Sequence, residues 1–258
     1  MGRTVKQTTV TTNGPCWVEL GTSDPDAAKA FYGELFGWRA VTDVRPEAGG
    51  YTQMHLGEAP AAAITPIYAP QQPVAWTVSF AVAEADATAA RIEGAGGRLL
   101  MGPADVFDLG RFAVAADPSG AVFTLWQARA FPGAGVFDAP GSLGWVELLT
   151  RDRESALAFY PKVFGWSVAP SEQYTQWGLA GQDFGGMLVM GEDFPPQVPP
   201  HWLPYFSVAD VGLTVSRATG LGADVLMPAT DVPDGPRIAV LRDGQGAAFG
   251  VYRAGTEG

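Results

Sequence analysis

Two glutamates stand in the same four-residue context in the two halves of this chain. Glu19 lies in Trp-Val-Glu-Leu at 17–20, and Glu147 lies in the same four residues at 145–148, an offset of 128 residues. A carboxyl group beside an indole and among apolar neighbours can accept a hydrogen bond from a ligand. It can also act as a general base, because burial raises its pKa. Glu19 and Glu147 are therefore the candidate catalytic residues.

The residues around each glutamate alternate as they do in a strand with one covered face. Val18 and Leu20 suit the face beneath a helix, which turns Trp17 and Glu19 toward the opposite face. The same alternation applies in the second half. The ligand-facing candidates of these strands are Trp17 and Glu19, and Trp145 and Glu147.

A structural role for the two glutamates is the alternative prediction. Arg111 and Arg237 occur at matched positions, 126 residues apart, and each is a candidate ion-pair partner for the glutamate of its own half. Buried carboxylates are usually paired, so such ion pairs would serve only to hold strands together.

A second matched segment adds polar and aromatic candidates. Tyr51-Thr52-Gln53 returns as Tyr174-Thr175-Gln176, and the tyrosine and glutamine of each segment share one face of a strand while Met54 or Trp177 faces the other way. The four side chains Tyr51, Gln53, Tyr174 and Gln176 are candidate contacts for an aromatic ligand. Cross-strand packing is the alternative role, because aromatic side chains on strands pack well against their neighbours.

The repeated segments predict a duplicated fold. Phe31-Tyr32 and Phe36-Gly37-Trp38 also return 128 residues later, and Phe80, Gly120-Ala121 and Phe123 return at an offset of 126. A repeated unit fixes an architecture, and the length divides into two domains that are each long enough to form a core. We predict domains at 12–128 and 142–254, with a Gly- and Pro-rich linker at 129–141.

Each half further divides into two similar pieces that read β-α-β-β-β. In the first piece, a strand over Cys16 to Thr22 precedes a helix capped by Asp24, with Pro25 at the first helical position and Asp152 as the matched cap. The second pieces place helices near 85–93 and 211–219. Asp117-Pro118-Ser119-Gly120 reads as a turn. The fold class is α+β, with curved mixed sheets that form cups and helices outside them.

Composition excludes several classes of partner. The chain of 258 residues has a net charge of −11, which disfavours nucleic acid and anionic lipid, and its apolar runs are too short to span a membrane. Without the apolar core of a signal peptide at its start, the chain is expected in the cytoplasm. The single cysteine, Cys16, forms no intrachain disulfide and reads as a small buried hydrophobic residue.

The pattern Asp-x-x-x-Ala-x-x-Phe-Tyr-x-x-x-Phe-Gly-Trp after a strand, with Asp-Pro-Ser-Gly before a final strand, resembles the vicinal oxygen chelate superfamily. That superfamily includes glyoxalase I, extradiol dioxygenases and bleomycin or fosfomycin resistance proteins. The resemblance covers nearly the whole chain and is greatest to the tandem two-domain actinobacterial type. It implies cups that bind small molecules.

Family members usually hold a metal with His, Glu or Gln side chains that reach into the cup. The resemblance places those positions at Trp17, Thr77 and Thr124 in the first half and at Trp145, Leu203 and Gly250 in the second. Indole offers only an N–H donor, so neither tryptophan binds a metal. His55 and His201 fall at unmatched positions. We therefore expect no metal and no cofactor, and we add Thr77 and Thr124 to the ligand-contacting candidates.

Three functions follow from these observations. The first is metal-independent binding of an aromatic or hydrophobic small molecule, as in resistance proteins of the superfamily. The second is an enzyme of secondary metabolism or detoxification, either a glyoxalase-like lyase or a hydroxylase or oxygenase type, with a glutamate of the cup as base. The third is a protein-interaction role for degenerate cups, which the surviving matched polar residues disfavour. A monomer or a homodimer is expected.

Overall fold

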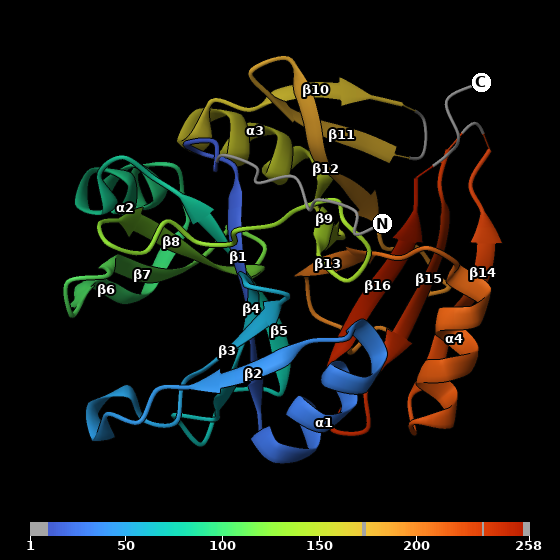
Figure 1. The fold of residues 1–258 in the computed structure, drawn as a ribbon. Helices are drawn as coiled ribbons and strands as arrows, with labels where there is room; N and C mark the ends of the chain where they lie inside the picture. The colour runs from blue at the N-terminus through green and yellow to red at the C-terminus, as the bar shows by residue number, and fades with distance from the viewer. Residues whose placement is uncertain (1–9, 172–173, 234, 255–258) are drawn as a thin grey trace.

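The computed structural model describes residues 10–171, 174–233 and 235–254. It consists of two tandem domains, each with one eight-stranded mixed sheet and two α-helices (Figure 1). The elements of domain 1 are β1 (Pro15–Thr22), α1 (Pro25–Phe36), β2 (Arg39–Thr42), η1 (Pro46–Ala48), β3 (Thr52–Leu56), β4 (Ala59–Pro66), β5 (Ala75–Ala81), α2 (Ala85–Gly94), β6 (Arg98–Val106), β7 (Gly110–Ala116) and β8 (Val122–Ala128). Those of domain 2 are β9 (Leu143–Thr150), α3 (Arg153–Phe164), β10 (Ser167–Pro170), β11 (Tyr174–Leu179), β12 (Gln182–Val189), β13 (His201–Ser207), α4 (Val211–Gly220), β14 (Asp224–Asp231), β15 (Arg237–Arg242) and β16 (Ala248–Arg253).

The strand order confirms four β-α-β-β-β pieces. The order in domain 1 is β2-β3-β4-β1-β5-β8-β7-β6, and domain 2 repeats it as β10-β11-β12-β9-β13-β16-β15-β14. Within each piece the first and last strands pair in parallel, as β1 pairs with β4, and the two pieces join through the antiparallel pair β1 and β5. The predicted α+β fold with curved sheets is confirmed.

The predicted caps of the first helix in each domain are confirmed. Asp24 Oδ1 accepts a hydrogen bond of 3.0 Å from the backbone N–H of Ala27, and Asp152 accepts the matching bond in α3. Each helix ends at a glycine with positive φ, 75° at Gly37 and 74° at Gly165, where a side chain would strain the backbone. Local capping thus fixes where both helices begin and end.

Strand alternation directs the side chains of β1 as predicted. Val18 and Leu20 are fully buried and pack with α1 residues such as Tyr32 in the main core. Trp17 belongs to a different cluster, on the opposite face. The helices therefore cover one face of each sheet, and the opposite, inner face carries the candidate site.

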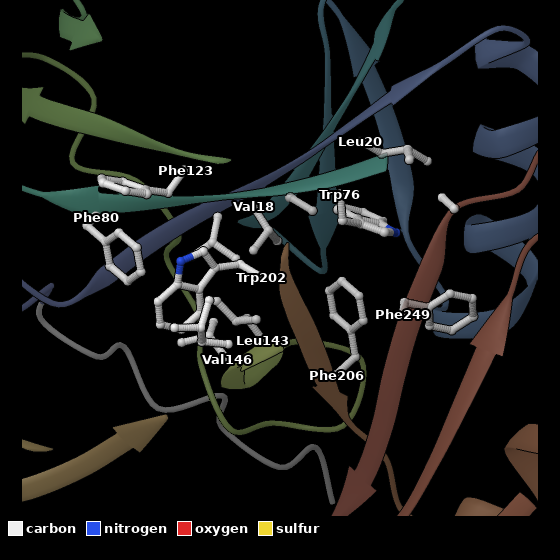
Figure 2. Packing of buried hydrophobic residues seen from close by; sticks show 14 of the residues in the cluster. Val18, Leu20, Trp76, Phe80, Phe123, Leu143, Val146, Trp202, Phe206 and Phe249 are labelled. Atoms are coloured by element: carbon white, nitrogen blue, oxygen red, sulfur yellow. The ribbon is translucent and has the colours of Figure 1, made fainter. Parts of the chain in front are cut away.

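The two domains share one main core, although each half is long enough to form a core of its own. The ring centroids of Phe80 and Trp202 lie 5.2 Å apart, and so do those of Trp76 and Phe206 (Figure 2). Helix α1 also contacts α4 of domain 2, and Phe31 packs edge-on against Phe249 (Figure 1). The apolar side chains of α1, β5, β13 and β16 thus pack across the domain boundary as well as within their own domain.

The segment between β8 and β9 packs along domain 1. Ala134 donates its backbone N–H to the Cys16 carbonyl at 2.8 Å, and the Phe131 ring stands edge-on to Trp17 at 5.0 Å. Cys16 itself is fully buried, as predicted, and burial raises the pKa of its thiol. Within the described residues, no helix is long and apolar enough to cross a membrane.

Candidate functional site

The inner face of the domain 1 sheet, which we name the first cup, gathers most of the candidates from that half. Glu19 on β1 lies directly opposite Thr77 on β5 and beside Ala63 on β4. Glu19 and Thr77 are both partly exposed on this face.

Glu19 is surrounded by hydroxyl groups rather than by cations. The Tyr51 hydroxyl accepts a hydrogen bond of 2.9 Å from Trp17 Nε1, and it also bonds the Glu19 carboxylate. Desolvation raises the pKa of Glu19 from 4.5 to about 7, and the Tyr51 hydrogen bond opposes that rise. Burial, with the nearby Glu19 charge, raises the pKa of Tyr68 to about 12. Glu19 can therefore exchange a proton near neutral pH.

The predicted glutamate–arginine pairs are wrong. Arg111 bonds Asp86 at 2.8 Å and Asp105 at 2.9 Å, and Arg237 pairs with Asp231. All three aspartates are exposed, so the two arginines form their ion pairs at the surface. Glu19 and Glu147 stay on the inner faces without either arginine.

The corresponding face of domain 2, the second cup, holds Glu147 in a closed arrangement. The Tyr205 hydroxyl donates to Glu147 Oε2 at 3.1 Å, and Tyr174 also bonds this carboxylate. Trp145 Nε1 donates to the Tyr174 hydroxyl at 2.9 Å, which repeats the contact between Trp17 and Tyr51. Glu147 is 7% exposed, and burial raises its pKa.

Side-chain size separates the two cups. Large side chains of domain 2 form an apolar cluster on its inner face, where the matched positions of domain 1 carry small or polar side chains. The cluster contains Leu149, Leu188, Leu203 and Tyr205, and the domain 1 residues at the same register positions are Gly21, Thr65, Thr77 and Ser79. The second cup is filled by its own large side chains. The first cup carries short side chains at these four positions, although the Gln72 side chain covers Gly21 and Ser79 is buried.

The remaining candidates have local partners. Gln53 Oε1 lies 3.2 Å from His55 Nε2, and Thr124 bonds the Ser79 hydroxyl at 2.5 Å. Gln176 is exposed at its place on β11, and His201 Nδ1 lies 2.8 Å from the Pro199 carbonyl. Among the candidates of domain 1, Trp17, Glu19, Tyr51, Thr77 and Thr124 come together on the inner face.

The side chains at the family's metal positions do not fit a metal ion. In the first cup these positions carry an indole and two threonine hydroxyls, and in the second cup they carry an indole, a leucine and a glycine. Proteins hold catalytic metals with imidazole, carboxylate or thiolate groups that converge on one point. Among residues 10–171, 174–233 and 235–254, no three His, Cys, Asp or Glu side chains are grouped in that way.

Ser79 and Tyr205, which occupy one matched position of the inner faces but differ in size, were not predicted from the sequence. Both residues lie next to a matched pair, Phe80 and Phe206, but they differ from each other. The positions that match between the halves predict the shared fold. They give no sign of Ser79 and Tyr205, because these two residues differ. Examining the mismatched positions on the inner face would have found them.

A crevice of about 170 Å³ has Val10 and Phe137 in its wall, and both of these residues also pack against the cluster that contains Trp17. It is bounded by residues 10–15, the end of the linker at Phe137 and Asp138, and β9 with the β11–β12 turn. Of the cup residues named above, Trp145 lines this crevice. The hydroxyl of Tyr252 donates to Asp138 at 2.7 Å beside this crevice.

The fold and the paired inner faces define a class of protein. Residues 15–125 and 142–251 both match the family model of the Glyoxalase/Bleomycin resistance protein/Dioxygenase superfamily, and the chain belongs to this superfamily. The 2,3-dioxygenase LapB of Pseudomonas sp. KL28 shares the fold, with a TM-score of 0.67 and 13% identity over 96% of this chain and 94% of that one.

Two relatives are similar over nearly their full length. The anthracycline biosynthesis protein DauV of Streptomyces sp. strain C5 is 40% identical, over 92% of each chain. CFP32 of Mycobacterium bovis, whose name includes the word glyoxylase, is 38% identical over 93% of this chain and 94% of its own.

Proposed function

We propose that this chain binds a flat aromatic or hydrophobic small molecule in the first cup without a metal held by the protein. The observation that carries the proposal is the difference between the cups at matched positions. Leu203 and Tyr205 fill the inner face of domain 2, while Thr77 and Ser79 leave Glu19 partly exposed in domain 1. Apolar surroundings with a few polar anchors are typical of small-molecule sites.

The names of relatives support an aromatic ligand. DauV and a second relative, DnrV of Streptomyces peucetius, which is 39% identical, are both named for anthracycline biosynthesis. Anthracyclines are built on flat, fused aromatic rings. The indole of Trp17 and the phenol of Tyr51 offer such rings an apolar wall with hydroxyl and carboxyl groups beside it. We therefore propose a polycyclic aromatic molecule of secondary metabolism as the ligand.

An enzymatic role in the same kind of metabolism is the second candidate. It is favoured by the pKa of Glu19, which burial raises to about 7. A carboxylate with that pKa removes a proton from a bound molecule more effectively than an ordinary glutamate, because it is a stronger base of which about half is ionised at pH 7. In this role Glu19 accepts the proton, and Thr77, opposite it, helps to orient the ligand.

Quenching of tryptophan fluorescence by flat aromatic compounds, from naphthalene to anthraquinone derivatives, tests binding. We expect saturable quenching, and a loss of about tenfold or more in affinity for Thr77→Leu, which places in domain 1 the residue that domain 2 has at this position. Tyr205→Phe, which alters only the second cup, is the control and should bind as the unaltered protein does. Quenching that never saturates with any compound would contradict the proposal.

Two further measurements separate binding from catalysis. Elemental analysis of untagged protein should find no stoichiometric transition metal if binding is metal-independent, and near-stoichiometric metal would overturn that part of the proposal. Compounds that bind are then incubated with the protein and analysed by mass spectrometry. Conversion that Glu19→Gln abolishes establishes the enzymatic candidate, and conversion that this variant retains removes Glu19 as the base.

A further inference from the structure

The second cup contains an aromatic ring bound to its own glutamate. The Tyr205 hydroxyl donates to Glu147 at 3.1 Å, and Tyr205 is itself 4% exposed. Its ring lies directly over Gly250 on the neighbouring strand β16, because a Cβ atom at Gly250 would stand 2.2 Å from ring atom Cδ1. Domain 2 thus shows how this sheet holds a phenol: the ring lies against β16 at Gly250 and the hydroxyl donates to the carboxylate.

Domain 1 repeats the sheet but not the phenol. Ser79 stands in place of Tyr205 and Thr124 in place of Gly250, and the two hydroxyls bond each other at 2.5 Å. Glu19 keeps the position of Glu147, since Glu19 lies opposite Thr77 as Glu147 lies opposite Leu203.

The two glutamates therefore differ by one hydroxyl partner. Glu147 receives bonds from both Tyr174 and Tyr205, whereas Tyr51 is the hydroxyl that bonds Glu19. Glu19 is also the more exposed of the two. A carboxylate offers about four lone-pair sites on its two oxygens, so Glu19 can accept a second hydroxyl on the side that faces β5.

We propose that the side chain of Tyr205 occupies in the second cup the place that the ligand takes in the first. The first cup then binds a phenol-bearing aromatic molecule whose hydroxyl donates to Glu19 and whose ring lies over β5 and β8 at Ser79 and Thr124. This inference rests on the proposed function, which leaves the ligand's functional group open. A hydrogen bond from a neutral hydroxyl to the ionised form of Glu19 is stronger than one between two neutral groups, so the phenol group contributes most to affinity where Glu19 is ionised.

The linker closes one end of this binding region. Phe131 packs edge-on against Trp17 at 5.0 Å, and its carbonyl accepts a hydrogen bond of 2.8 Å from Trp126 Nε1. Phe131 supplies an apolar wall but no hydroxyl for Glu19. The ligand therefore meets aromatic surface at the Trp17 end and polar groups at Glu19 and Thr77.

A pair of compounds that differ only in the donor tests the inference on the unaltered protein. We choose 2-naphthol and 2-methoxynaphthalene, which are both uncharged at pH 7, and measure affinity by equilibrium dialysis. We expect 2-naphthol to bind at least tenfold more tightly. Equal affinities would overturn the inference and leave the proposed function standing, whereas binding of neither compound, nor of any other flat aromatic, would remove the proposed function as well.

Variants assign the preference to Glu19. Glu19→Met keeps the length of the side chain but removes the acceptor, so the two naphthalenes should bind equally. Tyr205→Phe, the control in the second cup, should retain the preference of the unaltered protein. A preference that survives in Glu19→Met would overturn the role of Glu19.

The arrangement of domain 2 can also be installed in domain 1. Ser79→Tyr combined with Thr124→Gly should place a phenol on Glu19 and weaken 2-naphthol binding at least tenfold. Circular dichroism and thermal melting check that this double variant is folded. Undiminished binding of 2-naphthol by the folded double variant would contradict the pose. If the double variant does not fold, the comparison of 2-naphthol with 2-methoxynaphthalene on the unaltered protein tests the inference.

Discussion

The hydroxyl of Tyr160, on helix α3 of domain 2, donates a hydrogen bond of 2.9 Å to Asp117 Oδ2 in a turn of domain 1. The equivalent hydrogen bond in the other direction runs from Tyr32 on α1 of domain 1 to Asp243 of domain 2, also at 2.9 Å. In the turn, Asp117 Oδ1 accepts bonds from the backbone N–H groups of residues 119–121, so the carboxylate joins a local turn to the other domain. The two domains are thus tied twice, by buried and equivalent contacts.

Tyr160→Phe should lower the free energy of unfolding by about 2–4 kcal/mol. The hydroxyl also accepts from Trp202 Nε1 at 3.0 Å, so its removal leaves two buried polar groups without this partner, and each such group costs about 1–3 kcal/mol. Urea denaturation followed by circular dichroism measures the change. Tyr68→Phe, at an exposed tyrosine, is the control and should change stability little. A loss below about 0.5 kcal/mol in Tyr160→Phe would contradict the argument.

The shared core predicts that the two domains unfold together. Phe80 packs on Trp202 and Phe36 on Phe206, so separating the domains exposes large aromatic rings from both. A chain that ends at residue 128 should therefore lack a cooperative thermal transition, while the full chain shows one transition by both circular dichroism and tryptophan fluorescence. Two separate transitions in the full chain would show that the domains are energetically independent.

The sequence predicts the fold well because the residues matched between the halves are those that each half needs in order to fold. Asp24 and Gly37 act within a few residues, so local patterns are enough to place helix α1. The shared core was not predicted, because an apolar helix face such as that of Phe31 shows that it must be buried but not against which domain. The contact of Phe31 with Phe249 joins residues more than 200 positions apart.

The candidate site was likewise predicted in part. Alternation along β1 placed Trp17 and Glu19 on one face, and their partner Tyr51 came from a matched segment. The arginine partners were wrong because a matched position says nothing about which face of a strand a long side chain covers. The contents of the cups depend on mismatched residues such as Ser79 and Tyr205, whose effect appears only when neighbouring strands are placed side by side.

Glu19→Gln should remove part of the pH dependence of stability. The pKa of Glu19 is about 7 in the folded chain, against 4.5 without burial, so the folded state binds this proton more tightly. The resulting stabilisation is complete below about pH 4.5 and is lost as the pH rises through 7. The difference in stability between Glu19→Gln and the unaltered protein should therefore change by about 1–2 kcal/mol between pH 5.5 and pH 8, in favour of the variant at the higher pH.

Urea denaturation at both pH values measures that difference. The groups that face Glu19, Tyr51 and Tyr68, have raised pKa values and stay protonated across this range, so they do not contribute to the change. Glu154→Gln, at an exposed position in the first turn of α3, serves as the control for loss of one negative charge. A difference that is independent of pH would show that Glu19 titrates as an ordinary glutamate.

Gly250→Ala should be strongly destabilising, although alanine is small. A Cβ atom at this position would stand 2.2 Å from the Tyr205 ring, far inside van der Waals contact, and the ring is held by its bond to Glu147. Overpacking of this kind costs about 1–3 kcal/mol. Replacing the Tyr205 ring with a small side chain should remove the clash, because domain 1 carries Thr124 at the matched position with Ser79 beside it. In a background that carries Tyr205→Ser, Gly250→Ala should therefore cost less than about 0.5 kcal/mol.

The four proteins form a double-mutant cycle in which urea denaturation isolates the coupling between positions 205 and 250. Tyr205→Ser alone also lowers stability, because it leaves Glu147 with one partner fewer and opens space among Leu149 and Leu203. The cycle cancels this loss, so the quantity it measures is the coupling free energy between positions 205 and 250. Additive effects would mean that the backbone moves to admit the Cβ atom and that Tyr205 is not seated on β16. A coupling of about 1–2 kcal/mol would establish the ring position from which the ligand pose in domain 1 was inferred.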